Sequence, residues 1–208
     1  MLKSLLQLFL AIWVSAAHAG AYEDWFRAVD RDDGRTARQL LERGFDPNAP
    51  DERGNPSLFL ALRGQGSAVA EVLLTHPELR LDVPNANGET PLMIAALHGR
   101  LDWVRRLLDR GAAVNRDGWT PLHYAASGPE PQVVQLLLDR GARIDAPSPN
   151  RSTPLMLAAR YGDERNALLL VQRGADLTLR NDRALNAADF ARLGGRDSLA
   201  RRLEPAAR

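Results

Sequence analysis

The sequence contains no cysteine and, apart from Lys3, no lysine. The absence of cysteine excludes disulfides, thiolate metal sites and a lipid-attachment cysteine. Beyond residue 19 the chain carries 26 arginines and 26 acidic residues, so this part has no net charge. Proteins that capture nucleic acid need an excess of basic groups, and we therefore expect no nucleic-acid partner.

Sequence signatures of catalysis are also missing. The chain has no HExxH, no phosphate-binding glycine loop in a strand context and no GxSxG elbow. Only His76, His98 and His123 follow residue 19, and no group in the sequence completes a relay or a metal-ligand set with them. We expect no catalytic residue, no metal, no cofactor and no small-molecule substrate, and hence no enzyme.

One long apolar run occurs, in the amino-terminal MLKSLLQLFLAIWVSAAHAG. The basic Lys3, the apolar residues 5–14 and the small residues before Gly20 have the three-part layout of a secretory signal, with cleavage after Ala19. The run is short for a permanent membrane span. We expect residues 1–19 to be a signal peptide and residues 20–208 to be a bacterial periplasmic domain. The alternative is an uncleaved segment that anchors a scaffold at the inner membrane, facing the periplasm.

A repeated pattern occupies the rest of the chain. The segments NPSLFLAL, ETPLMIAAL, WTPLHYAAS and STPLMLAAR share it, and NAADFAR is a weaker fifth copy. Their marker residues are spaced by 34, 30, 33 and 33 residues and are Leu58, Leu92, Leu122, Leu155 and Ala188. A second series, with members such as VRRLLDRGAA, alternates with the first. Apolar residues three and four apart in these segments predict a pair of helices in each repeat.

The repeats carry start and stop signals for their helices. Thr-Pro begins the first helix, because a threonine hydroxyl caps free amides and proline fits the first turn. A glycine closes the second helix in the left-handed conformation, at positions 44, 111, 141 and 174. One helix pair cannot bury its apolar face alone, so the pairs are expected to stack around a shared core.

The repeats resemble ankyrin repeats, whose T-P-L-H-x-A motif stands at residues 120–125 and, altered, at 90–95 and 153–158. The resemblance implies an all-α ankyrin-repeat solenoid of about five helix-pair units with projecting hairpin-like loops, or fingers, capped at both ends. The fingers before Thr90 and Thr120 are expected to be shorter than is usual in the family. The repeats lie roughly at 22–53, 54–87, 88–117, 118–150, 151–183 and 184–208.

The resemblance also implies a surface for a partner protein, the concave face made by the finger tips and the exposed ends of the first helices. Large side chains that this face leaves partly open are typical of interface centres. Trp119 either contacts a partner or covers its own finger, and the sequence leaves both open. The residues expected to contact a partner are Phe59, Arg63, Glu89, Met93, Leu97, His98, Asp117, Trp119, Ser152, Arg160 and Tyr161.

His123 is the residue most suggestive of catalysis, because Trp119 and Tyr124 lie close to it in the sequence. In the family, the histidine of this motif hydrogen-bonds to the backbone of neighbouring loops, and the resemblance implies the same here. We therefore expect replacement of His123 to lower stability by about 1 to 3 kcal/mol, through unpaired buried groups, rather than to abolish a reaction.

The sequence thus predicts a monomeric, non-catalytic periplasmic protein that binds another protein through its concave face. Two roles remain open at this point. The protein is either an accessory partner that stabilises an enzyme, or an inhibitor or immunity protein that protects the cell from a toxin or hydrolase.

Overall fold

The computed structural model describes residues 20–64 and 66–205. These residues form six helix pairs, one for each predicted repeat, and no strand beyond an isolated bridge between Pro50 and Pro56. The all-α fold is therefore confirmed. The predicted signal segment, residues 1–19, lies outside the described residues. None of the helices that are described is long and apolar enough to cross a bilayer.

Residues 20–64 and 66–86 belong to one compact unit, the amino-terminal unit. Its helices are residues 20–30, α2 (Gly34–Glu42), α3 (Ser57–Arg63) and α4 (Ala68–Thr75). Trp25 ties these segments together, since it is fully buried, stacks on Phe45 at 4.8 Å between ring centroids and donates its Nε1–H to Ser57 Oγ at 2.8 Å. A buried tryptophan needs such an acceptor, and here Ser57 provides it.

Asp32 links the first helix pair of this unit to the second. Its carboxylate accepts the backbone N–H groups of Ser67, Ala68 and Val69 at 2.9 to 3.0 Å, and so caps the start of α4 from a distant part of the chain. The contact is so close that a Cβ at Gly66 would lie 2.2 Å from the Asp32 carboxylate. Glycine at position 66 therefore permits the cap.

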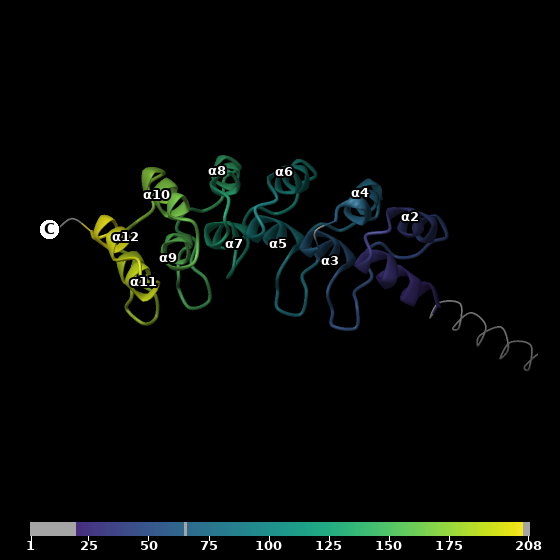
Figure 1. Ribbon diagram of the computed structural model, residues 1–208, viewed down its shortest axis with the longest axis horizontal. Helices are drawn as coiled ribbons and strands as arrows, with labels where there is room; N and C mark the ends of the chain where they lie inside the picture. The colour runs from purple at the N-terminus through teal and green to yellow at the C-terminus, as the bar shows by residue number, and fades with distance from the viewer. Residues whose placement is uncertain (1–19, 65, 206–208) are drawn as a thin grey trace, which may run out of the picture. The chain divides into compact units, whose positions relative to one another are not determined.

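Residues 87–205 belong to a second compact unit, the carboxyl-terminal unit. In Figure 1 its inner helices form one row, its outer helices another, and its fingers project on the side opposite the outer row. The inner helices are α5 (Pro91–Leu97), α7 (Pro121–Ser127), α9 (Pro154–Arg160) and α11 (Ala187–Leu193). The outer helices are α6 (Leu101–Asp109), α8 (Pro131–Asp139) and α10 (Glu164–Gln172), and α12 (Asp197–Arg202) packs on α11.

Small residues bring neighbouring repeats of this unit together. A Cβ at Gly162 would lie 1.9 Å from the carbonyl oxygen of Ala126, so only glycine fits there. The buried Asn166 then donates its amide to the carbonyls of Ala125, Ala126 and Gly128 at 2.8 to 3.3 Å. These carbonyls lie at the end of α7, where a helix leaves carbonyl groups for partners outside it, and Asn166 is such a partner.

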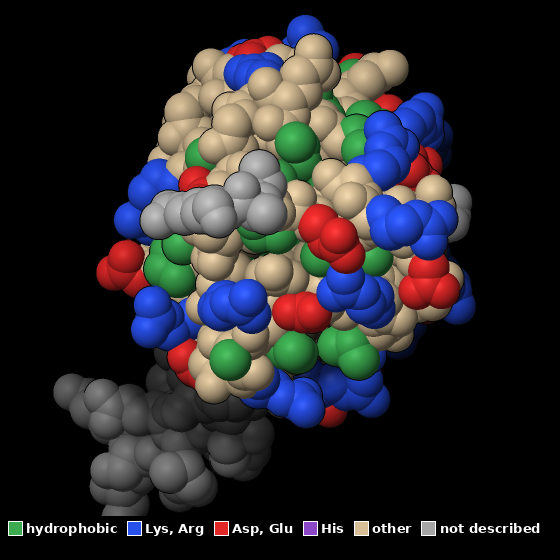
Figure 2. Space-filling model, turned by 90° about the vertical axis from the view of Figure 1, so that its left-hand side faces the viewer, with side chains coloured by type: hydrophobic (Ala, Val, Ile, Leu, Met, Phe, Trp, Pro, Cys, Tyr) green, Lys and Arg blue, Asp and Glu red, His purple; other side chains and the backbone are tan. Residues whose placement is uncertain are grey.

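The end of the carboxyl-terminal unit is polar, as expected of a cap. Figure 2 shows basic and acidic side chains interspersed on this end, with hydrophobic groups only in small separate patches. Arg202 of α12 pairs with Glu164 of α10 at 2.9 Å, and Arg192 of α11 pairs with Glu204. This mixture of charges keeps the last repeat compatible with water.

The fingers differ in length, and only one of the two expected short fingers is found. The segment before α7 spans residues 110–120, against 140–153 before α9 and 173–186 before α11, so it is shorter by three residues. The expectation for the loop before α5 is wrong, because that loop spans residues 76–90. The reason is that α4 ends early, at Thr75, since Pro77 disfavours a helical His76.

Candidate protein-binding surface

A small apolar pocket lies on the inner helices of the carboxyl-terminal unit, and we name it the α7 pocket. It has a volume of about 170 Å³ and is lined by Leu97, Trp119, His123, Tyr124, Ser127 and Leu157. It brings together two of the predicted contact residues, Leu97 at the end of α5 and Trp119 just before α7. A pocket lined in this way suits an apolar side chain of a partner.

Trp119 combines the two roles that the sequence left open. Its ring stands edge-on to His123, with 5.3 Å between centroids, so it covers the base of its own finger. The same ring lines the α7 pocket and is only partly buried. Trp119 is therefore held in place by the fold and still offers a surface for contact.

Tyr124 and Leu157 complete the pocket, and sequence reasoning missed them as contact residues. Tyr124 donates its hydroxyl to Glu89 Oε1 at 2.9 Å, and burial together with Glu89 raises the pKa of the phenol. The hydroxyl therefore stays protonated and holds Glu89 against α7. The available signal was Tyr124 itself, which stands where the other motifs have Ile94 and Leu157.

His123 braces neighbouring loops, as the family resemblance implied. The Thr120 N–H donates to His123 Nδ1 at 3.2 Å, so Nε2 carries the proton and donates to the Ser152 carbonyl at 3.0 Å. Burial lowers the pKa of the imidazole to about 4, while the hydrogen bond to the Ser152 backbone opposes this change. The ring is neutral at pH 7 and both nitrogens are engaged within the fold.

Three of the expected contact residues are buried, and the expectation that they are open is wrong. The exposed fractions are 3% for Phe59, 0% for Met93 and 1% for Ser152. Met93 folds back under its own helix start, where its sulfur accepts the Thr90 N–H at 3.3 Å. Ser152 is covered because the Asn181 amide of the next finger lies against its hydroxyl.

The remaining expected residues are accessible. Arg63, in the amino-terminal unit, is exposed, as are His98 and Asp117 in the carboxyl-terminal unit. Tyr161 is 57% exposed, and the Arg160 guanidinium lies over its ring at 5.0 Å from the centroid. A large aromatic ring exposed at the end of α9 suits a contact with another protein.

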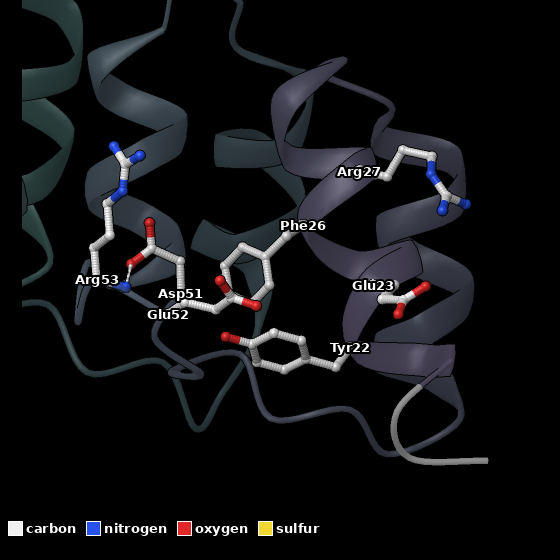
Figure 3. A pocket seen from close by; sticks show the side chains of 7 residues that line it. All are labelled: Tyr22, Glu23, Phe26, Arg27, Asp51, Glu52 and Arg53. Atoms are coloured by element: carbon white, nitrogen blue, oxygen red, sulfur yellow. Dashed lines mark hydrogen bonds between the residues drawn. The ribbon is translucent and has the colours of Figure 1, made fainter. Parts of the chain in front are cut away.

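The amino-terminal unit has a larger pocket that the sequence does not indicate, because the family resemblance implies only a cap at this end of the chain. It has a volume of about 450 Å³ and lies between residues 20–30 and the finger at residues 51–53. In Figure 3 the rings of Tyr22 and Phe26 point toward this finger, while Glu23 and Arg27 point away from it. We name this cavity the Tyr22 pocket. Its lining residues are Tyr22, Glu23, Phe26, Arg27, Asp51, Glu52 and Arg53.

No group of three or more His, Cys, Asp or Glu side chains gathers among residues 20–64 and 66–205 in a way that could hold a metal ion. The α7 pocket instead combines aromatic rings with two leucines, and the Tyr22 pocket combines two aromatic rings with charged side chains. Such surfaces are typical of protein recognition.

Comparison with known proteins agrees with the geometry. A model for ankyrin repeats in three copies matches residues 25–117 and 113–181. The chain belongs to the ankyrin-repeat family. Ankyrin repeats are protein-binding modules, so the ankyrin-repeat protein described here has the fold of a binding module throughout the matched residues.

Relatives of known sequence match this chain over part of their own length. NF-kappa-B inhibitor alpha of Sus scrofa is 41% identical over 85 residues, which are 38% of this chain and 27% of that protein. Ankyrin repeat and SAM domain-containing protein 6 of Rattus norvegicus is 34% identical over 148 residues, which are 71% of this chain and 13% of that protein. The ankyrin-repeat protein thus spans little more than a quarter, or less, of these relatives.

Among the solved structures that match is one that covers most of the chain. It is titled "Bd0816 Predatory Endopeptidase from Bdellovibrio bacteriovorus in complex with immunity protein Bd3460". The match has a TM-score of 0.73 and 26% sequence identity, and it covers 86% of this chain and 96% of the matched chain. The similarity therefore extends well beyond a shared pair of repeats.

Proposed function

We propose that this ankyrin-repeat protein is an immunity protein, which binds an endopeptidase made by the same cell and restrains it without itself catalysing a reaction. One observation carries the proposal: the chain matches, over 86% of its length, a solved structure of an endopeptidase in complex with an immunity protein. This observation favours the inhibitor role over the accessory role, which the sequence could not separate.

The surface of the carboxyl-terminal unit supports the proposal. The α7 pocket provides an apolar recess, and Tyr161 with Arg160 provides an exposed aromatic and a positive charge on the next repeat. Interfaces commonly place aromatic and arginine side chains at their centre. His123, the side chain most suggestive of catalysis, is neutral and engaged by backbone groups.

The direct test is inhibition of an endopeptidase from the same organism, starting with those encoded beside this protein. We expect addition of the purified ankyrin-repeat protein to lower the cleavage rate in proportion to the amount added, because a tight complex removes one enzyme for each chain bound. An endopeptidase that binds the chain and retains full activity would instead support the accessory role.

We also propose that the protein acts in the periplasm after removal of residues 1–19. The proposal rests on Lys3, the apolar residues 5–14 and the small residues before Gly20. Intact-mass measurement of the protein from the periplasmic fraction is expected to give a chain that begins at Gly20. A membrane-bound chain that retains Met1 would instead favour the anchored scaffold.

A further inference from the structure

The floor of the Tyr22 pocket consists of two aromatic rings in fixed positions. The Tyr22 hydroxyl donates to the Pro50 carbonyl at 3.0 Å, and the Tyr22 and Phe26 ring centroids lie 4.7 Å apart. Both side chains remain partly exposed. The hydrogen bond to the finger therefore holds an aromatic surface open to the solvent.

Two acidic residues, Asp51 and Glu52, line the same pocket. Asp51 accepts the Arg53 N–H, the Asn55 N–H and the Asn55 side-chain amide. Burial raises the pKa of Asp51, but these hydrogen bonds outweigh it and the net shift is downward, so the carboxylate stays ionised. Oδ2 has only the Asn55 amide as a donor and keeps a free lone pair.

Glu52 is the second carboxylate, and it has no hydrogen bond or ion pair to any residue that the structure describes. In Figure 3 its side chain extends toward the rings of Tyr22 and Phe26. Burial, and then the charges of Glu52 and Asp51, raise the pKa of the Tyr22 phenol. The negative charges of Glu52 and Asp51 therefore act on the Tyr22 ring, which forms part of the pocket floor.

The two arginines that line the pocket, Arg27 and Arg53, direct their guanidinium groups away from the rings (Figure 3). Arg27 pairs with Asp24 at 2.7 Å and points away from the finger, and the Arg53 guanidinium also points away from the rings in Figure 3. The whole segment from residue 20 to residue 86 has 12 acidic residues and 8 arginines, so the unit carries a net negative charge. A cation approaching the rings therefore meets attraction from both near and distant groups.

We infer that the Tyr22 pocket binds an arginine or lysine side chain of the partner protein. The rings of Tyr22 and Phe26 pack against its aliphatic stem and face its cation, Glu52 accepts its N–H groups (Figure 3), and the ionised Asp51 adds negative charge to the pocket. The inference deepens the proposed function, since it rests on a protein partner and gives the chemistry of one of that partner's contacts.

The pocket is tested first without the partner. The purified chain, with ¹³C at tyrosine Cζ, is titrated at low salt with acetyl-Gly-Arg-Gly-amide, and acetyl-Gly-Gln-Gly-amide serves as the uncharged control. We expect only the arginine peptide to shift the Tyr22 signal saturably. Glu52→Gln should weaken this binding about threefold, the size expected for one exposed charge pair, and Glu42→Gln on α2 should not. Equal shifts with both peptides, or unchanged binding to Glu52→Gln, would overturn the inference.

The second arm uses the endopeptidase complex and separates the inference from the proposed function. Glu52→Arg is expected to weaken the complex at least about tenfold, because a like charge then faces the partner's basic group, while Glu42→Arg leaves it unchanged. If wild type inhibits the enzyme and Glu52→Arg inhibits equally well, the pocket inference fails and the immunity role stands. If the arginine peptide binds but no endopeptidase does, the proposed function fails and the pocket stands as a site for basic side chains.

Discussion

Acidification from pH 7 to pH 4 is expected to lower the free energy of unfolding by roughly 3 kcal/mol through His123 alone. The imidazole has a pKa of about 4 in the folded chain, against 6.5 for an unperturbed histidine. Above pH 6.5 both states are neutral and the full stability is present. Between pH 6.5 and 4 the unfolded state binds a proton that the folded state does not, so stability falls, and below pH 4 this contribution levels off. Urea unfolding at pH 7, 5.5 and 4 measures the effect.

Two variants isolate this histidine from the other groups that titrate in the same range. His123→Gln removes the titrating ring, so its stability should fall less between pH 7 and pH 4 than that of wild type. His98→Gln, at an exposed position, should keep the wild-type dependence. The explanation is contradicted if His123→Gln and wild type lose the same free energy on acidification. At pH 7, His123→Leu should cost about 1 to 3 kcal/mol, because it leaves the Thr120 N–H and the Ser152 carbonyl unpaired.

Replacement of Trp119 and Tyr161 together by alanine is expected to weaken binding to the partner endopeptidase by about two orders of magnitude or more. Each is a large aromatic group at an accessible position, and such residues commonly contribute about 2 kcal/mol, or roughly thirtyfold in affinity, when they lie at the centre of an interface. Replacement of Trp119 removes one wall of the α7 pocket, and replacement of Tyr161 removes an exposed ring at the end of α9. Calorimetric titration of the purified endopeptidase measures the change.

The controls for this variant separate folding from contact. Because Trp119 packs edge-on to His123, its removal also disturbs the base of the finger, whereas Tyr161→Ala removes a ring that is mostly in solvent. Thermal unfolding should show little change for Tyr161→Ala, which therefore reports contact alone. Arg105→Ala, exposed on the outer helix α6, should bind as wild type does. If the double variant binds with unchanged affinity, the partner does not use this face.

The amino-acid sequence by itself determined the repeat and the helix pairs, and its resemblance to ankyrin repeats implied the role of His123. Thr-Pro and the closing glycines are local signals, since a cap or a left-handed turn depends on a few neighbouring residues. The structure bears them out: Thr90 and Thr153 cap their helices, and φ at the glycines at 44, 111, 141 and 174 lies between 85° and 94°. The exception is the loop before α5, where Pro77 ended α4 earlier than the repeat pattern indicated.

Only the tertiary structure decided which side chains a partner can reach. Repeat position gives the helix face of a residue, but exposure depends on how its side chain folds and on what the next repeat places against it. Met93 and Ser152 are therefore covered, while Leu97 lines a pocket. The Tyr22 pocket could not be predicted from the sequence either, because it forms only when two segments pack together. Its rings and carboxylates come from segments about 25 to 30 residues apart, and the Tyr22 hydroxyl bond to the Pro50 carbonyl brings them together. Such a contact is set by the packing of one segment on another, which no short stretch of the sequence records.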